Sequence, residues 1–286
     1  MMIQTLGKSY EVLQYEHSDS NMERFLCREE KSHGRCTIVR IRNKMWITKA
    51  MEFLMVQLEN HHFTDFISCF AGEESLYIVM AYAEGISLAE KLQNEDCLLE
   101  ERLAMGKNIL QKILIQDMPA YFLQDCLSGE NVILMPDLEV GFRYRLSGIS
   151  GYDKVKYVHV LKGLGRLFEL LFFREIKQKM IPPLNRFYHS LATGRYKDML
   201  EIYREYTEMW NMVQNMPSEE IQMPGTRLFS LWDKVRKVFV LLKKILAFFL
   251  MLCAILFLIY TVRRQMQEDG EKRIFEYIGT LEIQDR

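Results

Sequence analysis

An uncharged apolar run near the C-terminal end constrains this chain more than any other feature. Residues 245–262 read ILAFFLMLCAILFLIYTV, and twelve of these eighteen residues are Leu, Ile, Phe or Val. As a helix the run spans ~27 Å, close to a hydrocarbon core, and its side chains favour insertion by roughly 4–7 kcal/mol. Two basic residues bound it on each side: Lys243, Lys244, Arg263 and Arg264. We therefore expect one transmembrane helix over residues 238–262. A buried core helix is the alternative, which the basic pairs disfavour.

The remaining sequence indicates on which side of the membrane the larger part lies. The first residues, MMIQTLGKSYEVLQ, lack a basic patch followed by an apolar core, so we expect no signal peptide. The six cysteines form no CxxC pair, which is typical of reduced thiols in the cytosol. Basic residues number five before the run and four after it, a difference that barely discriminates. Together these features predict a single-pass cell-membrane protein with a cytoplasmic N-terminal domain and residues 263–286 outside.

Hydrophobic periodicity predicts a strand-rich N-terminal part and a mostly helical part after it. Strands are expected at residues 10–15, 25–28, 36–41, 63–70 and 75–82, with a helix at 45–60. A short hairpin is expected at 131–134 and 140–146. Further helices are expected from residue 87 and at 98–116, 158–179, 183–191 and 196–214. Five strands with one helix after the third, followed by helices, is the layout of a protein-kinase fold.

Three segments, in the family's own order, resemble the protein kinase-like superfamily. SLYIVMAYAEGISLAEKL (75–92) resembles the fifth strand, the hinge and the following helix. LSGENVIL (127–134) resembles the end of the catalytic loop, and LGRLFELLF (164–172) resembles the core helix of the C-lobe. The resemblance implies an α+β, two-lobe fold with a five-stranded N-lobe sheet plus a helix (1–83) and a helical C-lobe (84–214). A linker and juxtamembrane segment (215–237), the transmembrane helix (238–262) and a short tail (263–286) would follow.

Against the family pattern, the N-lobe lacks the parts that hold phosphates. The turn that should be glycine-rich reads EHSDSNMERF (16–25) and contains no glycine. The lysine of the third strand falls at Arg40, and its helical carboxylate partner would be Glu52. A planar guanidinium does not replace a compact ammonium without cost. The alternative, a surface strand residue and a solvated helix face, is the interpretation we favour.

The catalytic loop departs further from the pattern. The aspartate that accepts the substrate proton becomes Cys126, and Asp125 lies one residue early, where an extended segment would point it to the other side. Asn131 matches the family's magnesium-binding asparagine, although a turn or cap asparagine is the alternative. The metal-binding aspartate of the DFG motif corresponds to Leu146. The core helix has Val160 near the place of its bracing aspartate, and the short segment before it leaves no room for an activation segment.

Other site types are not indicated. His61 and His62 beside Asp65 are adjacent and do not share a helical face, so we expect no metal site. Cys126 as a nucleophile would need a nearby base, and a buried thiol is the favoured interpretation. The net charge is −1 with acidic and basic residues interleaved, so we expect no nucleic-acid partner.

Several missing parts together indicate a pseudokinase. The preferred hypothesis is a membrane-anchored, catalytically inactive scaffold or regulatory subunit without a cofactor, whose partners are the bilayer and other membrane or cytoplasmic proteins. Its architecture is similar to the kinase-like membrane subunit of bacterial type VII secretion systems, from which it departs in its short outer tail. The second hypothesis is a divergent Ser/Thr kinase or nucleotide-binding sensor that uses ATP, magnesium, Arg40, Glu52, Asp125 and Asn131. A plain anchoring adaptor is the third.

Overall fold

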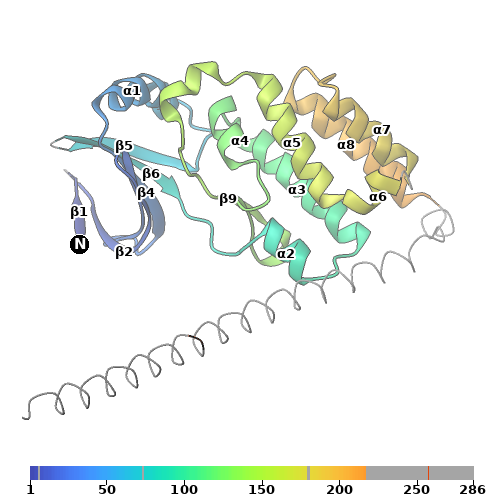
Figure 1. Cartoon of the computed structure of the whole chain (residues 1–286), viewed down its shortest axis with the longest axis horizontal. Coiled ribbons are helices and arrows are strands. Elements are labelled where there is room, and N and C mark those ends of the chain that lie inside the picture. Colours follow the sequence, from blue (N-terminus) through green and yellow to red (C-terminus); the bar gives the residue numbers. More distant parts are fainter. Residues whose placement is uncertain (6, 73, 179–180, 217–256, 258–286) are drawn as a thin grey trace, which may run out of the picture. The chain divides into compact units, whose positions relative to one another are not determined.

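The computed structural model describes residues 1–5, 7–72, 74–178, 181–216 and 257. The chain divides into two units, Met1–Ile221 and Gln222–Arg286, and the labelled helices and strands of Figure 1 belong to the first. The transmembrane helix predicted over 238–262 and the tail 263–286 lie outside the described residues, apart from Phe257. Among the residues that are described, no helix is long and apolar enough to cross a membrane.

The first unit is a mixed α+β structure, with a curled antiparallel sheet followed by helices (Figure 1). The sheet has six strands in the order β1-β2-β3-β4-β6-β5. Their bounds are β1 Met2–Gln4, β2 Ser9–Ser18, β3 Met22–Glu29, β4 Arg35–Ile41, β5 Phe66–Gly72 and β6 Ser75–Ala81. The prediction of five strands is wrong because β1 adds a short edge strand to β2. Only Ile3 of its three residues is buried, which is too little periodicity to detect in a sequence.

The two faces of this sheet bury different sets of side chains. On one face Val39, Ile41 and Ile78 pack in the core that also contains Ala50 and Leu54 of α1 (Lys44–Leu58). The other face carries a separate small cluster: Tyr10, Phe25, Cys27, Cys36, Ile38 and Val79, with Ile3 from β1. Because successive strand residues point to opposite faces, the buried apolar residues of β4 divide between these two cores by their position in the strand.

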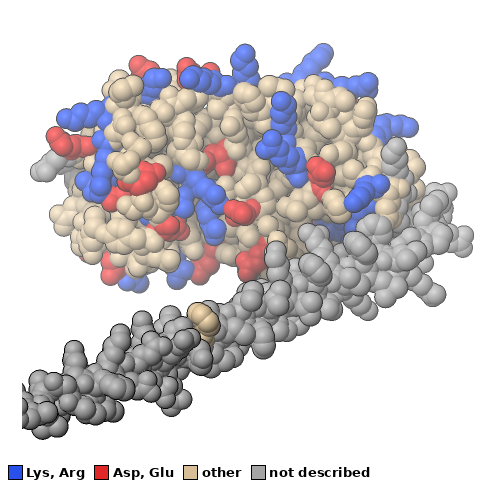
Figure 2. Space-filling view, in the orientation of Figure 1, with Lys and Arg blue, Asp and Glu red and all other residues tan. Residues whose placement is uncertain are grey.

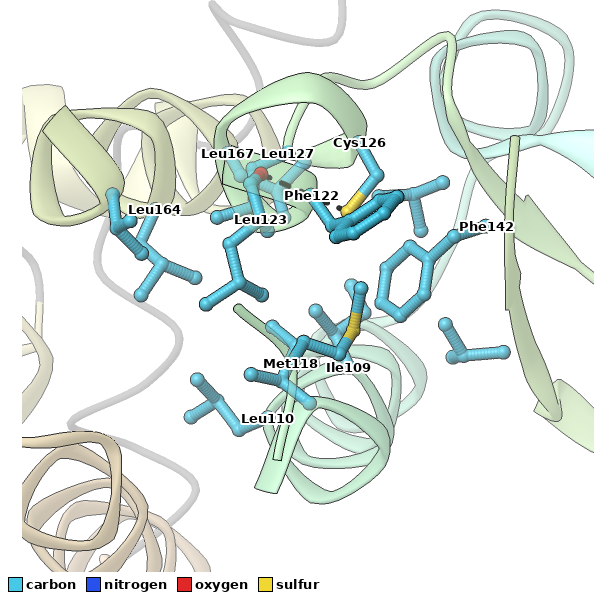
Figure 3. Close-up of a cluster of buried hydrophobic side chains, with 14 of the residues drawn as sticks. Ile109, Leu110, Met118, Phe122, Leu123, Cys126, Leu127, Phe142, Leu164 and Leu167 are labelled. Carbon is cyan, nitrogen blue, oxygen red and sulfur yellow. Dashed lines mark hydrogen bonds between the residues drawn. The ribbon is translucent and has the colours of Figure 1, made fainter. Parts of the chain in front are cut away.

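The helical half begins with β7 (Ile86–Ser87), which pairs with β8 (Val132–Leu134), itself paired with β9 (Val140–Phe142). The helices are α2 Leu88–Asn94, α3 Leu99–Gln116, α4 Ala120–Cys126, α5 Tyr157–Leu171, α6 Phe173–Gln178, α7 Pro182–Ala192 and α8 Met199–Gln214. Two short 3-10 turns, Pro136–Leu138 and Ile149–Lys154, lie on either side of β9. Figure 3 shows labelled apolar side chains from α3, α4 and α5 converging, with Phe122, Cys126 and Phe142 together. This packing fixes α4, whose last residues approach the candidate site.

Helix α4 corrects the sequence-based expectation for its segment. The sequence predicts an extended loop around Asp125, but this residue lies in the last turn of the helix. Tyr121, Phe122 and Leu123 are buried, so packing against the core favours the helix. Because the segment is only seven residues long, its helical periodicity is barely expressed in the sequence.

The helix predicted over 158–179 is broken at Phe172, which separates α5 from α6. At the break the Arg102 guanidinium of α3 donates to the carbonyl of Leu171 at 2.8 Å and forms two hydrogen bonds with Glu175, at 2.6 and 2.9 Å. Arg102 and Glu175 are both buried. The carbonyl that leaves the helical ladder thus gains a charged donor, which stabilises the break.

Asp65 joins the sheet half to the helical half. It lies between α1 and β5, and its carboxylate accepts hydrogen bonds from Gln116 Nε2 at 2.5 Å and from the Tyr144 hydroxyl at 2.8 Å. Lys112 Nζ lies 3.3 Å from the same carboxylate. One hydrophobic core also runs from Met22 and Val39 in the sheet to the helices. The two halves are therefore tied by both apolar packing and a buried polar cluster.

Candidate functional site

A polar pocket of about 280 Å³ lies where α4, the turn before β8 and the segment after β9 meet. It is lined by Tyr121, Gln124, Asp125, Ser128, Asn131, Arg145 and Ser147. These residues come from the segments that the sequence singles out around Asp125, Asn131 and Leu146. Of the four residues proposed for the nucleotide-binding alternative, the pocket brings Asp125 and Asn131 together.

The Asp125 carboxylate is held by the backbone of the segment after β9. Its Oδ2 accepts hydrogen bonds from the N–H of Arg145 at 2.7 Å and of Leu146 at 2.9 Å. Its Oδ1 accepts a longer one from the Ser147 hydroxyl at 3.3 Å. Leu146 has φ 54°, in the left-handed region, and successive N–H groups in such a turn form an anion-binding concavity. In this protein, the chain's own carboxylate fills that concavity.

Two opposing effects act on the ionisation of Asp125. Burial raises the pKa of its carboxyl group, and the hydrogen bonds from Leu146 and Arg145 lower it, with burial the larger effect. Burial likewise raises the pKa of the neighbouring Tyr121, Cys126 and Tyr144 side chains, which therefore stay neutral near pH 7. The hydrogen bonds from the backbone thus offset only part of the cost of burying this carboxyl group.

Asn131 is 4 % exposed and uses only part of its hydrogen-bonding capacity. Its Nδ2 donates to the backbone carbonyl of Asp125 at 2.8 Å. Its Oδ1 is buried and has no hydrogen-bond partner among the described residues. An unpaired buried acceptor is unfavourable, so this oxygen lowers the stability of the folded chain.

Leu146 and Cys126 have structural surroundings. Leu146, which the resemblance to kinases aligns with a metal-binding aspartate, is fully buried in the main hydrophobic core. The Cys126 thiol is also fully buried and donates to the carbonyl of Leu123. Burial raises the pKa of Cys126 well above its usual value. The prediction of a buried thiol is therefore confirmed, and the thiolate needed for nucleophilic chemistry is disfavoured.

Arg40 and Glu52 are not brought together. Arg40 pairs with Glu23 at 3.4 Å, donates to the Ser75 hydroxyl at 3.0 Å and lies over the ring of Tyr77. Its neighbours in the strand, Val39 and Ile41, face the core that contains α1, so Arg40 points to the opposite face. Glu52 is an exposed residue of α1.

Sequence reasoning missed Glu23 as the partner of Arg40 and Arg42. Glu23 is directly opposite Arg40 in the β3–β4 pairing and also forms a hydrogen bond with Arg42. The alternation of residues along β3 and β4 indicates which residues share a face. The pairing of Glu23 with Arg40 also requires the register between the two strands, which the sequence does not show.

The turn between β2 and β3 is closed by its own side chains. The Asp19 carboxylate accepts hydrogen bonds from the N–H groups of Asn21 and Met22, at 2.7 and 2.8 Å. This is the local pattern of an Asx turn, which fixes the backbone of the turn where the resemblance to kinases leads one to expect glycines.

The histidines His61 and His62 are exposed, and Asp65 points to the helical half instead. Within the ranges that the structure describes, no three His, Cys, Asp or Glu side chains gather as metal ligands. Basic and acidic side chains are mixed over the face in view (Figure 2). In comparisons with known proteins, no family model and no curated protein matches this chain.

Proposed function

We propose that this chain is a membrane-anchored, catalytically inactive kinase-like protein that acts by contact, as a scaffold or regulatory subunit of a membrane assembly. The apolar run 245–262 supports the anchoring. The order of elements supports the kinase likeness: an antiparallel sheet with α1 inserted before its last two strands, a connection over residues 82–85, and a helical half.

The observation that supports the inactive role is that the Asp125 carboxylate already accepts hydrogen bonds from the backbone. A general base needs a carboxylate that can reach the substrate's proton. Asp125, the carboxylate next in sequence to the expected position of this base, instead accepts hydrogen bonds from the N–H groups of Arg145 and Leu146. Leu146 offers no oxygen to a divalent cation, and Arg40 lies on the face of β4 away from α1.

The alternative, a nucleotide-binding sensor, is supported by Asn131. Asn131 is one of the residues that line the pocket, and an amide oxygen is a ligand that magnesium accepts.

Thermal unfolding of the full chain in detergent with ATP and magnesium separates the two functions. A ligand at a hundred times its Kd stabilises the folded state by about 2.7 kcal/mol. For a unit of this size that raises Tm by about 5–10 °C. We expect no shift above the EDTA control and no release of γ-phosphate. A saturable rise in Tm that the substitution Asn131→Ala removes would contradict the inactive role.

A further inference from the structure

Helices α5 and α7 pack together through the rings of Phe168 and Phe187, whose centroids are 5.4 Å apart, and they form a basic face. We propose that this face docks on the surface of a bilayer that contains anionic lipid headgroups. The inference goes beyond the anchor of the proposed function, because it gives the folded unit its own contact with the membrane. It rests on that function in one respect: the apolar run at 245–262 must keep the chain at a bilayer.

Basic residues are concentrated in the segment that contains these helices. Residues 143–197 include twelve Lys or Arg and three Asp or Glu, a net charge of +9, whereas the whole chain has a net charge of −1. Over the right half of the view in Figure 2, where Figure 1 places α5, α6 and α7, Lys and Arg side chains are more prominent than acidic ones. The segment therefore gives a nearly neutral protein one positive surface.

The basic side chains of this face are available to an outside partner. Lys162 and Arg166 of α5, Arg186 of α7 and Arg195 just after α7 are all exposed. Among the residues that the structure describes, none of these four has a carboxylate within ion-pair distance. Their charges are therefore not compensated by the protein itself.

The acidic residues of the same segment offset little of this charge at the surface. Glu175 lies in the buried ion pair at the break between α5 and α6. Burial and the neighbouring Glu169 carboxylate raise the pKa of Tyr188, so Glu169 is turned toward α7. Asp198, the next acidic residue along the chain, caps the first turn of α8. Asp153 is the exposed carboxylate that remains in the segment.

Apolar and basic side chains share the exposed side of α5. Val158, Lys162, Arg166 and Leu170 follow one another at intervals of four residues, which places them on one side of the helix. All four are exposed, while the opposite side of α5 packs in the core. This arrangement suits the boundary between headgroups and acyl chains, because basic side chains reach the phosphates while aliphatic ones enter the apolar layer.

A bilayer fits this face better than a nucleic acid or an acidic protein does. Single-stranded nucleic acids bind where aromatic side chains offer stacking surfaces in a positive groove, whereas the exposed apolar side chains of α5 are the aliphatic Val158 and Leu170. A soluble partner would have to reach the face by diffusion. A chain anchored through residues 245–262 instead keeps lipid headgroups at a high effective concentration. Anionic headgroups attract each basic residue near their surface.

Hydrogen exchange of the full chain in lipid nanodiscs tests the docking. One set of discs contains phosphatidylcholine alone, and the other contains phosphatidylglycerol as well. Amide exchange in α5 and α7 should be about fivefold slower in the anionic discs, while β2, β3 and β4 should exchange equally in both. High salt should remove the difference, because it screens the attraction between exposed charges.

Charge reversal locates the contact. Lys162→Glu with Arg166→Glu should return exchange in α5 and α7 to its rate in neutral discs, because each basic residue contributes about fivefold to the docking equilibrium. Lys31→Glu with Lys49→Glu is the matched control. It makes the same change of charge at exposed lysines of the sheet half and should preserve the difference between the discs.

A second pair on the same face, Arg186→Gln with Arg195→Gln, should also reduce the difference between the discs. It decides the question if the first pair does not fold. Equal exchange of the wild-type chain in both kinds of disc overturns the assignment, and so does a difference that survives the substitutions on the face.

The test also includes the soluble partners. Single-stranded RNA and a polyglutamate peptide are added to the chain in neutral discs. Protection of α5 and α7 by either of them, without protection in anionic discs, overturns the assignment in favour of that partner. Failure of the anchoring is distinguishable, because the chain would then not remain with the discs during their purification. A chain that remains with the discs but shows no protection has an anchor and no docked face.

Discussion

Asp125 and Asn131 are linked by a hydrogen bond between the Asn131 side chain and the Asp125 backbone. The amide of Asn131 holds the carbonyl of Asp125, while the Asp125 carboxylate holds the N–H groups of Arg145 and Leu146. The unusual left-handed backbone of Leu146 is thereby stabilised at a residue without a glycine's freedom. At this scale the Asp125 side chain works as a structural hydrogen-bond acceptor.

This role predicts different outcomes for two substitutions of Asp125. Asp125→Ala leaves two N–H groups without their acceptor and should lower the free energy of unfolding by about 1–3 kcal/mol. Asp125→Asn keeps an oxygen in place and should change it by less than about 1 kcal/mol. Urea unfolding at pH 7 measures both. Equal losses for the two variants would argue against a hydrogen-bonding role.

The raised pKa of Asp125 determines in which direction the free energy of unfolding changes with pH. Its contribution to stability is fully present below the unfolded-state pKa, about 3.9, and is lost as the pH rises through the higher folded-state pKa. Tyr121, Cys126 and Tyr144 stay neutral over this range and do not oppose it. Relative to Asp125→Asn, the wild-type chain should therefore lose stability as the pH rises from about 4. If the free energy of unfolding of the wild-type chain and of Asp125→Asn changed with pH in the same way, this prediction would be contradicted.

At the scale of elements, the break between α5 and α6 depends on one buried ion pair. Replacing Arg102 by Met leaves Glu175 buried without its cation and frees the carbonyl of Leu171. We expect a loss of about 3–5 kcal/mol in the free energy of unfolding. The matched control is Arg35→Met, in the exposed pair of Arg35 with Glu84, which should cost at most about 1 kcal/mol. Chemical denaturation compares them, and similar losses would show that burial of the pair is immaterial.

At the scale of the whole molecule, the polar cluster around Asp65 couples the two halves. Asp65→Ala leaves the buried hydroxyl of Tyr144 without its acceptor and the amide of Gln116 with only its 3.3 Å hydrogen bond to the Thr64 hydroxyl, at a cost of about 3–5 kcal/mol. Hydrogen exchange should quicken in β5 and in the last turns of α3 together. Tyr144→Phe, which removes one hydrogen bond, is the milder control at about 1 kcal/mol. Faster exchange confined to one half would refute the coupling.

Attachment to the bilayer belongs to the same scale. Two arginines at the centre of the run, Leu252→Arg with Ile255→Arg, should cost roughly 5–7 kcal/mol of insertion free energy, which offsets the gain of the apolar side chains. The wild-type chain should sediment with membranes after carbonate washing, and the double variant should move to the aqueous fraction. Leu252→Ala with Ile255→Ala is the control. Membrane retention of the arginine variant would exclude the run as the anchor.

The strongly periodic elements of this protein could be located from the amino-acid sequence. The strands β2 to β6 and the helices α1, α3, α7 and α8 lie close to their predicted positions, because each buries one face in a repeating pattern. The burial of Cys126 was likewise predicted, because the sequence shows no nearby base that would make it a nucleophile.

The contacts between polar side chains could not be located from the sequence and depend on the folded arrangement. Asp65 and Tyr144 are 79 residues apart, and no local pattern pairs them. The register between β3 and β4 places Arg40 opposite Glu23 and not beside Glu52. Packing against the core stabilises α4 as a helix. The backbone after β9 donates hydrogen bonds to the Asp125 carboxylate. Hydrophobic periodicity predicts which face of a helix or strand is buried. The partner of a polar group depends on the placement of other elements, which distant parts of the chain supply.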